Sequence, residues 1–502
     1  MIKKLVCVFV CVFVAISTLS AKREKKPQEV DSLGNKIKTG WNFGVLPSIA
    51  YDADRGFQGG LLGNVYFYGD GSQYPEYIHS IYFEGAYSTK HNGIARIHYD
   101  SKYLIPNHRV TLDATYVPDA MNDFYGFNGY QSVYNRDWVF WKKNPNKMSG
   151  KEEYLSRVFY KYRRDMVRFA GDFEGTIWRD IKWNAGLGVL AYIVGECDVD
   201  MLNGKREFDP EKQRWDQKPL DASVKGLYEK YCDWGLIGDD EKKGGWHPYL
   251  RGGFSYDTRD KRQGPNRGIY ADAFFTYTAA FNSSIYGQQA AAGYNYLQFN
   301  ATFRHYVPCY RDSKGQHRIT FAYRLGLQNT IAGQTPFYMQ NYLNTQFIQR
   351  MFYEGLGGGN SVRGLMANRV LANGFAYANI EFRFRVVNFD IGRQHFFVGL
   401  NPFFDLAMVT QPYKLEELDH HDTGLSLRKR VEADGYQYDD FFSDKKSDIY
   451  RPHTTAGVGL KVGMNENFVL SADWAMPVGA KHYMEQDNGK YSNFYVKMGY
   501  LF

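Results

Sequence analysis

The chain has 502 residues, a formal net charge of +7, and 41 Tyr, 36 Phe and 50 Gly. Beyond the N-terminal segment, no stretch reaches the roughly 18 to 20 apolar residues that a membrane-spanning helix needs, which excludes helical membrane proteins. The charge is mild, and no basic tract is interleaved with aromatic residues, so we expect no nucleic-acid partner. The aromatic and glycine content predicts an all-β protein, either a large exported domain or an outer-membrane β-barrel.

The N-terminus has the pattern of a secretory signal peptide. Lys3 and Lys4 precede an apolar run from Leu5 to Ile16, and small residues follow up to Ala21. We therefore expect residues 1–21 to be removed on export. Residues 22–40 are rich in lysine and poor in apolar residues, which predicts a short, flexible periplasmic lead. Residues 41–502 are expected to form one domain in the outer membrane.

Several segments alternate apolar and polar residues with a period of two, as strands do when their two faces meet different surroundings. Apolar residues recur on one face of three such segments: Ile319, Phe321, Tyr323, Leu325 and Leu327; Ala378, Ile380, Phe382, Phe384 and Val386; Val398, Leu400, Phe404, Leu406 and Met408. A transmembrane antiparallel barrel of about sixteen strands, apolar outside and polar inside, fits this pattern because it leaves no open edge.

The predicted connections fall into two groups. Short polar turns alternate with long excursions at residues 119–155, 196–246, 330–373 and 410–452. With both termini in the periplasm, all the long excursions lie on the outer side of the membrane, as bacterial barrels require.

Three cysteines remain after removal of the signal peptide: Cys197, Cys232 and Cys309. An exported protein can form disulfides, and a bridge between Cys197 and Cys232 is possible. Three free thiols are equally compatible with the sequence, which gives no geometry.

Catalytic and metal-binding motifs are missing. Ser361 is surrounded by glycines but lacks the Gly-x-Ser-x-Gly elbow of serine hydrolases. Glu416–Asp422 could bind a divalent cation, but a hydrated outer loop is the favoured interpretation. Asp257–Asp260 is interpreted as a charge-paired turn rather than a chelating site. We expect no catalytic residue, no metal and no cofactor, and hence no enzyme.

The pattern of the C-terminal residues predicts a final strand. Its apolar face would carry Ser492, Phe494, Val496, Met498, Tyr500 and Phe502. A chain that ends in an aromatic strand of this kind resembles the terminal targeting signal of outer-membrane barrels, with Tyr500 and Phe502 as the recognised residues.

Three motifs together resemble one family. "GGGNSVRGL" followed by "ANGFAYANIEFRF" is similar to the "VRG" loop and the following strand of the BamA and TamA outer-membrane assembly family, also called the bacterial surface antigen family. "FSYDTRDKRQGPNRGIY" at 254–270 and "FFDLA" at 403–407 resemble two further stretches of that family, in the family's order. The resemblance runs from about residue 41 to the end.

The resemblance implies that the loop carrying Val362, Arg363 and Gly364 folds into the lumen. Arg363 would then meet an acidic residue of the inner wall, Asp405, with Glu381 as a second candidate. Independently of the family, the alternation places both carboxylates on the inward face. Glycines suit such a loop because they tolerate positive φ and close backbone approach.

The family implies a role in inserting or translocating outer-membrane proteins, with outer-membrane lipid and client barrels as partners. Two departures matter: Leu365 stands where the family has Phe or Tyr, and residues 22–40 are too few for a periplasmic POTRA domain. A separate periplasmic subunit would have to supply that module. The alternative is a channel or surface receptor on the same scaffold, since a fold alone does not fix function. Inward-facing arginines could favour anions in such a pore, or they could equally be pinned by Glu381, Asp405 and the folded loop: Arg304, Arg318, Arg324, Arg383 and Arg385.

Overall fold

The structure is a computed structural model, and it describes residues 37–52, 56–74, 76–89, 91–139, 154–203, 220–262, 264–279, 284–285, 288–289, 294–313, 315–348, 353–391, 394–464, 468–479 and 492–502. The expected signal peptide and residues 22–36 of the lead lie outside the described residues. The expected domain division therefore stays a prediction.

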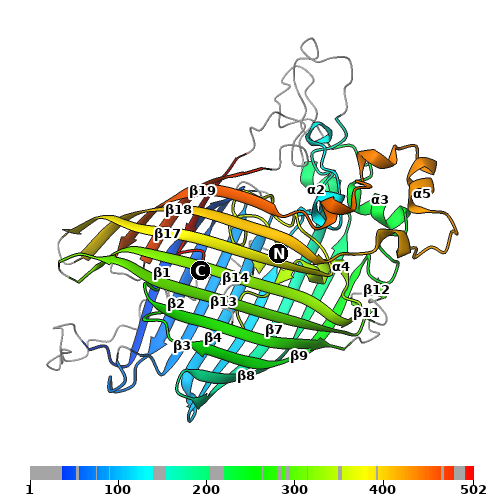
Figure 1. Cartoon of the computed structure of the whole chain (residues 1–502). Helices are drawn as coiled ribbons and strands as arrows, with labels where there is room; N and C mark the ends of the chain where they lie inside the picture. Colours follow the sequence, from blue (N-terminus) through cyan, green and yellow to red (C-terminus); the bar gives the residue numbers. More distant parts are fainter. Residues whose placement is uncertain are drawn as a thin grey trace.

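Within the described part of the chain, the main sheet is antiparallel and has seventeen strands, and one of them, β6 (Asn122–Asp123), is a two-residue strand that pairs there only with β7. The other sixteen are called the wall strands (Figure 1). They are β1 (Trp41–Asp52), β2 (Gly56–Phe67), β3 (His79–Ser88), β4 (Gly93–Ile105), β5 (His108–Val117), β7 (Lys161–Trp178), β8 (Ile181–Gly195), β9 (Gly244–Asp257), β10 (Gly268–Thr278), β13 (Tyr296–Arg311), β14 (His317–Gly333), β17 (Gly374–Ile391), β18 (Gln394–Gln411), β19 (His453–Met464), β20 (Phe468–Pro477) and β21 (Asn493–Met498).

The wall strands pair in chain order, each with the next one along the sequence. The last strand, β21, also pairs with the first, β1, at Tyr51↔Val496 and Asp52↔Tyr495. This pairing joins the two edges of the sheet. The expected antiparallel barrel of about sixteen strands is thus confirmed.

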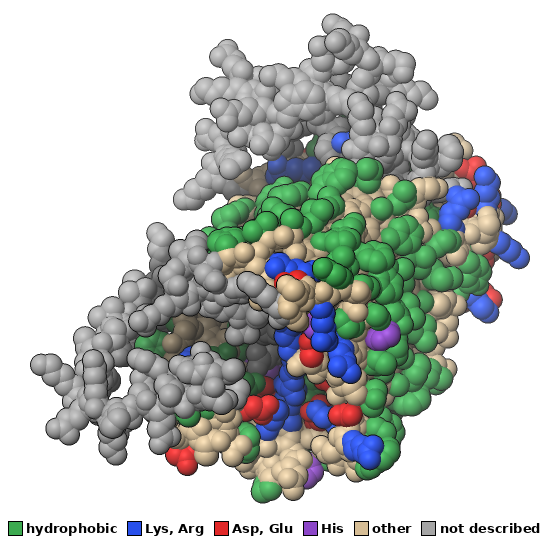
Figure 2. All heavy atoms as spheres, turned by 60° about the vertical axis from the view of Figure 1, so that its left-hand side comes forward, with side chains coloured by type: hydrophobic (Ala, Val, Ile, Leu, Met, Phe, Trp, Pro, Cys, Tyr) green, Lys and Arg blue, Asp and Glu red, His purple; other side chains and the backbone are tan. Residues whose placement is uncertain are grey.

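The two faces of the wall differ as the alternation predicts. Phe382 and Phe404 are 44% and 40% exposed on the outer face, whereas Glu381 and Asp405, one position away, are fully buried. Figure 2 looks toward the end opposite the helices: hydrophobic side chains cover the outer wall, and charged side chains line the hollow inside it. An apolar outside and a charged inside are what a barrel in lipid requires.

Short elements lie in the connections at one end of the barrel (Figure 1). The helices are α2 (Val199–Asn203), α3 (Leu227–Asp233), α4 (Phe337–Gln340), α5 (Leu427–Ala433) and α6 (Lys446–Ile449), with 3-10 turns η1 (Gly129–Gln131), η2 (Arg136–Trp138), η4 (Leu415–Glu417) and η5 (Tyr438–Asp440). Two small hairpins are β11 (Ser284–Ile285) with β12 (Gln288–Gln289), and β15 (Tyr342–Leu343) with β16 (Tyr353–Glu354). Every helix among the described residues is too short or too polar to cross a membrane.

The described residues of four long connections, 118–160, 196–243, 334–373 and 412–452, pack together into what we call the loop cap. Aromatic rings from all four meet in it: the centroid distances are 5.7 Å for Phe124–Phe337 and 4.9 Å for Trp234–Phe441. The predicted excursions match these connections to within a few residues. The sequence interpretation missed that these connections share one core. Aromatic residues in loops have no regular spacing from which their contact partners could be inferred.

The C-terminal residues do not follow the expected strand. Strand β21 ends at Met498, and Gly499 has a φ of +87°. The chain then turns inward, so that Leu501 and Phe502 are buried against Tyr306 and Ala322. The expectation that Tyr500 and Phe502 continue the lipid-facing strand is wrong, because Gly499 permits a backbone turn that alternation cannot reveal. A targeting role for these two residues stays a prediction.

Candidate functional site

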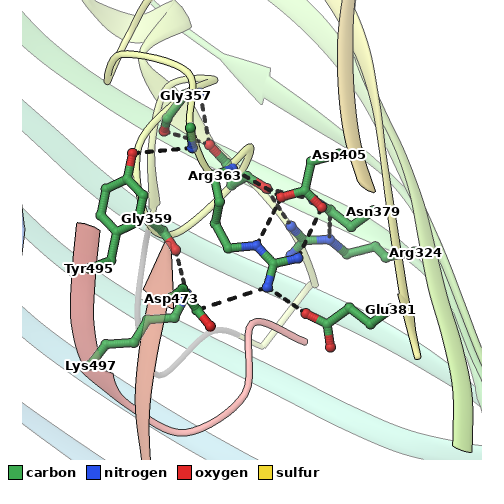
Figure 3. A network of polar contacts seen from close by, with 12 residues as sticks. Arg324, Gly357, Gly359, Arg363, Asn379, Glu381, Asp405, Asp473, Tyr495 and Lys497 are labelled. Atoms are coloured by element: carbon green, nitrogen blue, oxygen red, sulfur yellow. Dashed lines mark hydrogen bonds and ion pairs between the residues drawn. The ribbon is translucent and has the colours of Figure 1, made fainter. Parts of the chain in front are cut away.

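The candidate site is the tip of the 334–373 connection, inside the barrel (Figure 3). Among the described residues of this tip, two glycines explain why it can be so tight. A Cβ at Gly357, whose φ is +115°, would lie 1.8 Å from the carbonyl oxygen of Met366. A Cβ at Gly364, whose φ is +85°, would lie 2.9 Å from the Cβ of Ala475 on β20. Only glycine tolerates both the positive φ and the close approach.

Arg363 sits at the centre of this tip and is fully buried. Its Nε and Nη2 atoms donate to the two carboxylate oxygens of Asp405 at 2.9 and 3.0 Å, and its backbone N–H donates to the same carboxylate at 3.0 Å. Nη1 donates to Glu381 at 2.7 Å. The structure therefore brings together the loop arginine and both wall carboxylates that the sequence singled out.

The guanidinium also stacks on an aromatic ring. Its carbon Cζ lies 3.4 Å from the ring centroid of Phe403, which is two positions before Asp405 on the inward face of β18. A planar guanidinium can bind carboxylates in its plane and a ring on its face at once. This combination fixes the side chain in three dimensions, which a lysine at the same position could not reproduce.

Around Arg363 lie further charged groups that the sequence interpretation did not select. Asp473 on β20 is 3.9 Å from Nη1 of Arg363, and Lys461 on β19 pairs with Asp473 at 2.5 Å. Lys497 on β21 is 3.7 Å from Asp473 and donates to the carbonyl of Gly359 in the loop. Period-two alternation in the last three strands would have placed these three groups inward. We name Arg363, Glu381, Asp405, Lys461, Asp473 and Lys497 the lumenal network.

Through Arg363, Gly364 and the carbonyl of Gly359, the loop tip is tied to four wall strands. Its partners come from β17, β18, β20 and β21, and the backbone N–H of Gly364 also donates to the hydroxyl of Tyr495 on β21 at 3.3 Å. Val362 is buried in the core of the loop cap. Leu365, which replaces the aromatic residue that the family resemblance implies, is also buried there.

Three of the five inward-facing arginines that suggested an anion channel are held by the loop, the wall and the tail. Arg304 donates to the carbonyl of Thr345 at 2.7 Å, and Arg324 donates to Asn379 at 2.8 Å and to the carbonyl of Ser361 at 3.3 Å. Arg383 donates to Glu381 at 2.9 Å and to the carbonyl of Phe502 at 2.8 Å. For these three residues, the geometry favours pinned arginines over an open cationic lining.

A second charged cluster on the inner wall escaped the sequence interpretation. Asp113 on β5 accepts from Arg96 on β4 at 2.8 Å and from Arg168 on β7 at 2.9 Å, and it lies 3.0 Å from Nδ1 of His98. All of these side chains are buried. Alternation along β4, β5 and β7 would have placed them inside the barrel, but not opposite one another.

The remaining sequence candidates have structural roles. The hydroxyl of Ser361 donates to the carbonyl of Gly357 at 2.7 Å, which braces the loop tip. Arg259 binds Asp257 through two hydrogen bonds of 2.8 and 2.9 Å, which makes the predicted charge-paired turn.

In the 416–422 segment, Asp419 pairs with Arg430 at 2.5 Å. His421 Nε2 lies 2.6 Å from the carbonyl of Cys232. The described residues hold no cluster of three or more His, Cys, Asp or Glu that could bind a metal ion.

Cys197, Cys232 and Cys309 are free thiols, so the possible bridge between the first two is not formed. Cys197 lies in the 196–243 connection and Cys232 in helix α3 within it. Burial raises the pKa of both thiols to about 12. They are therefore protonated at neutral pH and poor nucleophiles.

Three solved structures are similar at low identity: BamA from Haemophilus ducreyi lacking POTRA domains 1-3 (15% identity, 97% of this chain and 78% of that one, TM-score 0.48), CdiB from Escherichia coli (13%, 90% and 62%, TM-score 0.45) and CdiB from Acinetobacter baumannii (10%, 93% and 61%, TM-score 0.42). No curated protein sequence matches the chain. The family model for the Omp85 superfamily domain matches residues 205–502, which is more than half of the sequence. The chain belongs to the Omp85 superfamily, and this membership indicates a location in the outer membrane.

Proposed function

We propose that this protein helps to insert or translocate other proteins at the outer membrane by offering the edge of its first strand to a client strand. The observation that carries this proposal is the weak seam between β1 and β21. Within the described residues, β1 pairs with β2 from Trp41 to Asp52, but with β21 only at Tyr51 and Asp52. The rest of β1 is a strand edge on that side, and an exposed edge is a template for another strand.

The lumenal network supports the proposal because it touches the seam strand. Lys497 and Tyr495 of β21 hold the loop tip, while β17 and β18 hold the same tip from the other side. The loop thereby braces β21 from inside the barrel. Opening of the seam can then proceed on the β1 side, with β21 kept in place by the loop.

A pair of engineered cysteines at the seam tests the proposal. Tyr51 and Val496 are partners across the seam, and Leu187 and Leu250 are partners within the wall on β8 and β9. We expect the oxidised Tyr51→Cys, Val496→Cys variant to lower the abundance of other barrels in the outer membrane, and a reducing agent to restore it. The oxidised Leu187→Cys, Leu250→Cys variant should leave that abundance unchanged. Cys309, which is exposed, is replaced by Ser in both variants.

The proposal fails if the seam-locked protein supports normal levels of every other barrel, or if depletion of the protein changes none of them. In that case the channel or receptor alternative is the better interpretation. Conductance of the purified protein in planar bilayers, with and without Arg363→Ala, would then be the decisive measurement.

A further inference from the structure

Strand β1 contains a proline, Pro47, near its middle, where it pairs in register with Leu61 of β2. A proline has no N–H to donate, so it interrupts whichever ladder that N–H would have joined. On one side of β1 that ladder is the one with β2, and on the other side it is the seam. The direction in which the missing donor would point therefore determines the effect of Pro47.

The hydrogen bonds just before β1 establish this direction. The N–H of Tyr68 donates to the carbonyl of Gly40 at 2.9 Å, so these two residues form a hydrogen-bonded pair between the two strands. In an antiparallel ladder, hydrogen-bonded and non-hydrogen-bonded pairs alternate. Even-numbered residues of β1 therefore bond to β2, and odd-numbered residues turn their N–H and C=O groups to the seam. Tyr51, which pairs with Val496 of β21, follows this rule. The donor that Pro47 lacks is thus missing from the seam side.

The proline divides the seam side of β1 into two parts. Toward the loop cap, β21 pairs with the last two residues of the strand. When that register is extended, Pro47 lies opposite Tyr500, just beyond the turn at Gly499 where the tail leaves the wall. On the other side of the proline, residues 41–46 have no partner strand at the seam within the described part of the chain.

Residues 41–46 lie at the periplasmic end of the barrel. Strands β1 and β5 run in the same direction and β5 ends at the loop cap, so β1 begins at the opposite end, and barrels turn their long loops outward. On the outer face, Trp41 and Phe43 are 64% and 76% exposed. On the inner face, a Cβ at Gly44 would have no heavy atom within 4 Å beyond its chain neighbours. There is thus room on this face for the side chains of one more strand.

We propose that Pro47 limits a client strand to residues 41–46 of β1 and stops it from pairing farther toward the loop cap. This inference rests on the proposed function, because it concerns the same strand edge. Phe43 and Val45 present N–H donors on the seam side, whereas the next position of that kind is the proline. A strand held by so few hydrogen bonds can dissociate again, and the pairing of β21 with the far end of β1 is left intact.

Disulfide trapping with a peptide tests this inference. The probe is a synthetic peptide with the sequence of residues 492–498, which include the β21 residues that pair with β1, carrying the change Tyr495→Cys. The full-length protein carries Cys309→Ser and either Gly44→Cys or Ser48→Cys, one on each side of the proline. The all-D form of the peptide has the same thiol but a strand twist of the opposite hand. Its rate therefore corrects for the reactivity of each cysteine.

We expect the L peptide to react with the Gly44→Cys protein about tenfold faster than the D peptide does, and with the Ser48→Cys protein no faster. Adding Pro47→Val restores the donor and suits a strand, so it should raise the ratio of L to D rates for Ser48→Cys about tenfold. Pro402→Val is the matched control, because β18 is paired on both sides within the wall. It should leave both ratios unchanged.

The inference is overturned if both cysteines show the same high ratio of L to D rates while Pro47 is in place, a comparison that needs no change at the proline. It is also overturned if Pro47→Val leaves the ratio for Ser48→Cys unchanged. In these two cases the peptide still pairs at Gly44→Cys, so the proposed function stands without the stop. A ratio of about one for Gly44→Cys would mean that β1 accepts no added strand, and the proposed function would then fail together with the inference.

Discussion

Arg363 shows how a single buried charge can order a long loop. Burial by itself lowers the pKa of Arg363, but Asp405 and Glu381 outweigh burial and hold that pKa above its ordinary value. The residue is therefore a permanent cation in a site with little water, and the free energy of its desolvation is offset only while both carboxylates stay in place. The loop position and the wall geometry depend on each other through this one side chain.

Replacing Arg363 should release the loop. Removing one partner of a buried charge pair costs roughly 3 to 5 kcal/mol, so we expect Arg363→Ala to expose the 334–373 connection to protease in the otherwise folded barrel. Arg363→Lys keeps the charge but loses the two-pronged contact with Asp405, and we expect an intermediate rate of cleavage. The measurement is limited proteolysis with mass mapping of the cut sites.

An exposed arginine of the loop cap provides the control for this prediction. Arg428 pairs with Asp444 at 2.5 Å on the surface, where such pairs contribute little to stability. Arg428→Ala should be cut like the wild type. Equal digestion of Arg363→Ala and the wild type would contradict the anchoring role.

At the residue scale, the sequence predicted the site residues best where a family motif and the period-two alternation of strand side chains agreed. Arg363 came from the motif, and Asp405 and Glu381 came from both the motif and the alternation. Asp473, Lys461 and Lys497 were missed because inward direction alone does not say which inward groups face one another across a lumen. That information requires strand tilt and register, which side-chain alternation does not contain.

At the scale of elements, the loop cap depends on a buried carboxyl group. Glu241 lies just before β9 and accepts a hydrogen bond from the backbone N–H of Phe337, at the start of α4, at 3.0 Å. Burial raises the pKa of Glu241 to about 8, although hydrogen bonds from Phe337 and Gly238 oppose that rise. The side chain is therefore neutral at pH 7 and connects two loops of the cap as an uncharged acceptor.

The loop cap should lose stability as the pH rises. The folded state holds the proton of Glu241 more tightly than the unfolded state, whose carboxyl has its ordinary pKa of 4.5. The contribution of this proton to the free energy of unfolding is fully present below pH 4.5. It declines between pH 4.5 and about 8, and it is lost above that. The decline can reach about 1.4 kcal/mol per pH unit within that window.

Hydrogen exchange of the loops from pH 5 to pH 9, corrected for intrinsic exchange rates, measures this effect. Glu241→Gln keeps an acceptor for Phe337 but cannot ionise, so its exchange should be nearly independent of pH over the same range. The idea is wrong if the wild type and Glu241→Gln show the same pH dependence.

At the scale of the whole molecule, the C-terminal tail contacts the lumenal network through its aromatic rings. The ring centroid of Phe502 lies 5.1 Å from Cζ of Arg383 and 5.3 Å from Cζ of Arg324, and the ring centroid of Tyr500 lies 4.4 Å from Cζ of Arg383. Arg383 in turn pairs with Glu381, which binds Arg363. The tail, the wall and the loop are thus one connected set of contacts from the end of the chain to the loop cap.

Two phenylalanines near the C-terminus distinguish a folded-in tail from a plain strand. Phe502 is buried inside the barrel, whereas Phe494 is 46% exposed on the outer face of β21. We expect Phe502→Ala to lower the free energy of unfolding by roughly 3 kcal/mol, as for a buried aromatic residue. Phe494→Ala, which loses contact mainly with lipid, should cost much less. Equal effects in thermal unfolding in detergent would argue against the inward tail.

The global fold could be predicted from the sequence because one period, repeated along the chain, specifies strand number, direction and the two faces together. The inward tail could not, since Tyr500 and Phe502 stand at positions that continue the apolar face of β21. The shared core of the loop cap was equally out of reach, because its contacts join residues far apart in sequence.

The position of the 334–373 loop sets an order of events during biogenesis. Its carboxylate partners at Glu381 and Asp405 follow it closely in the chain, but Lys497, which holds Gly359, is near the very end. The loop can dock on an open, curved sheet once β17 and β18 have paired. To enter a barrel that has already closed, it would have to pass through the end that the loop cap fills. We therefore expect the barrel to close around the docked loop, with β21 as the last strand to pair.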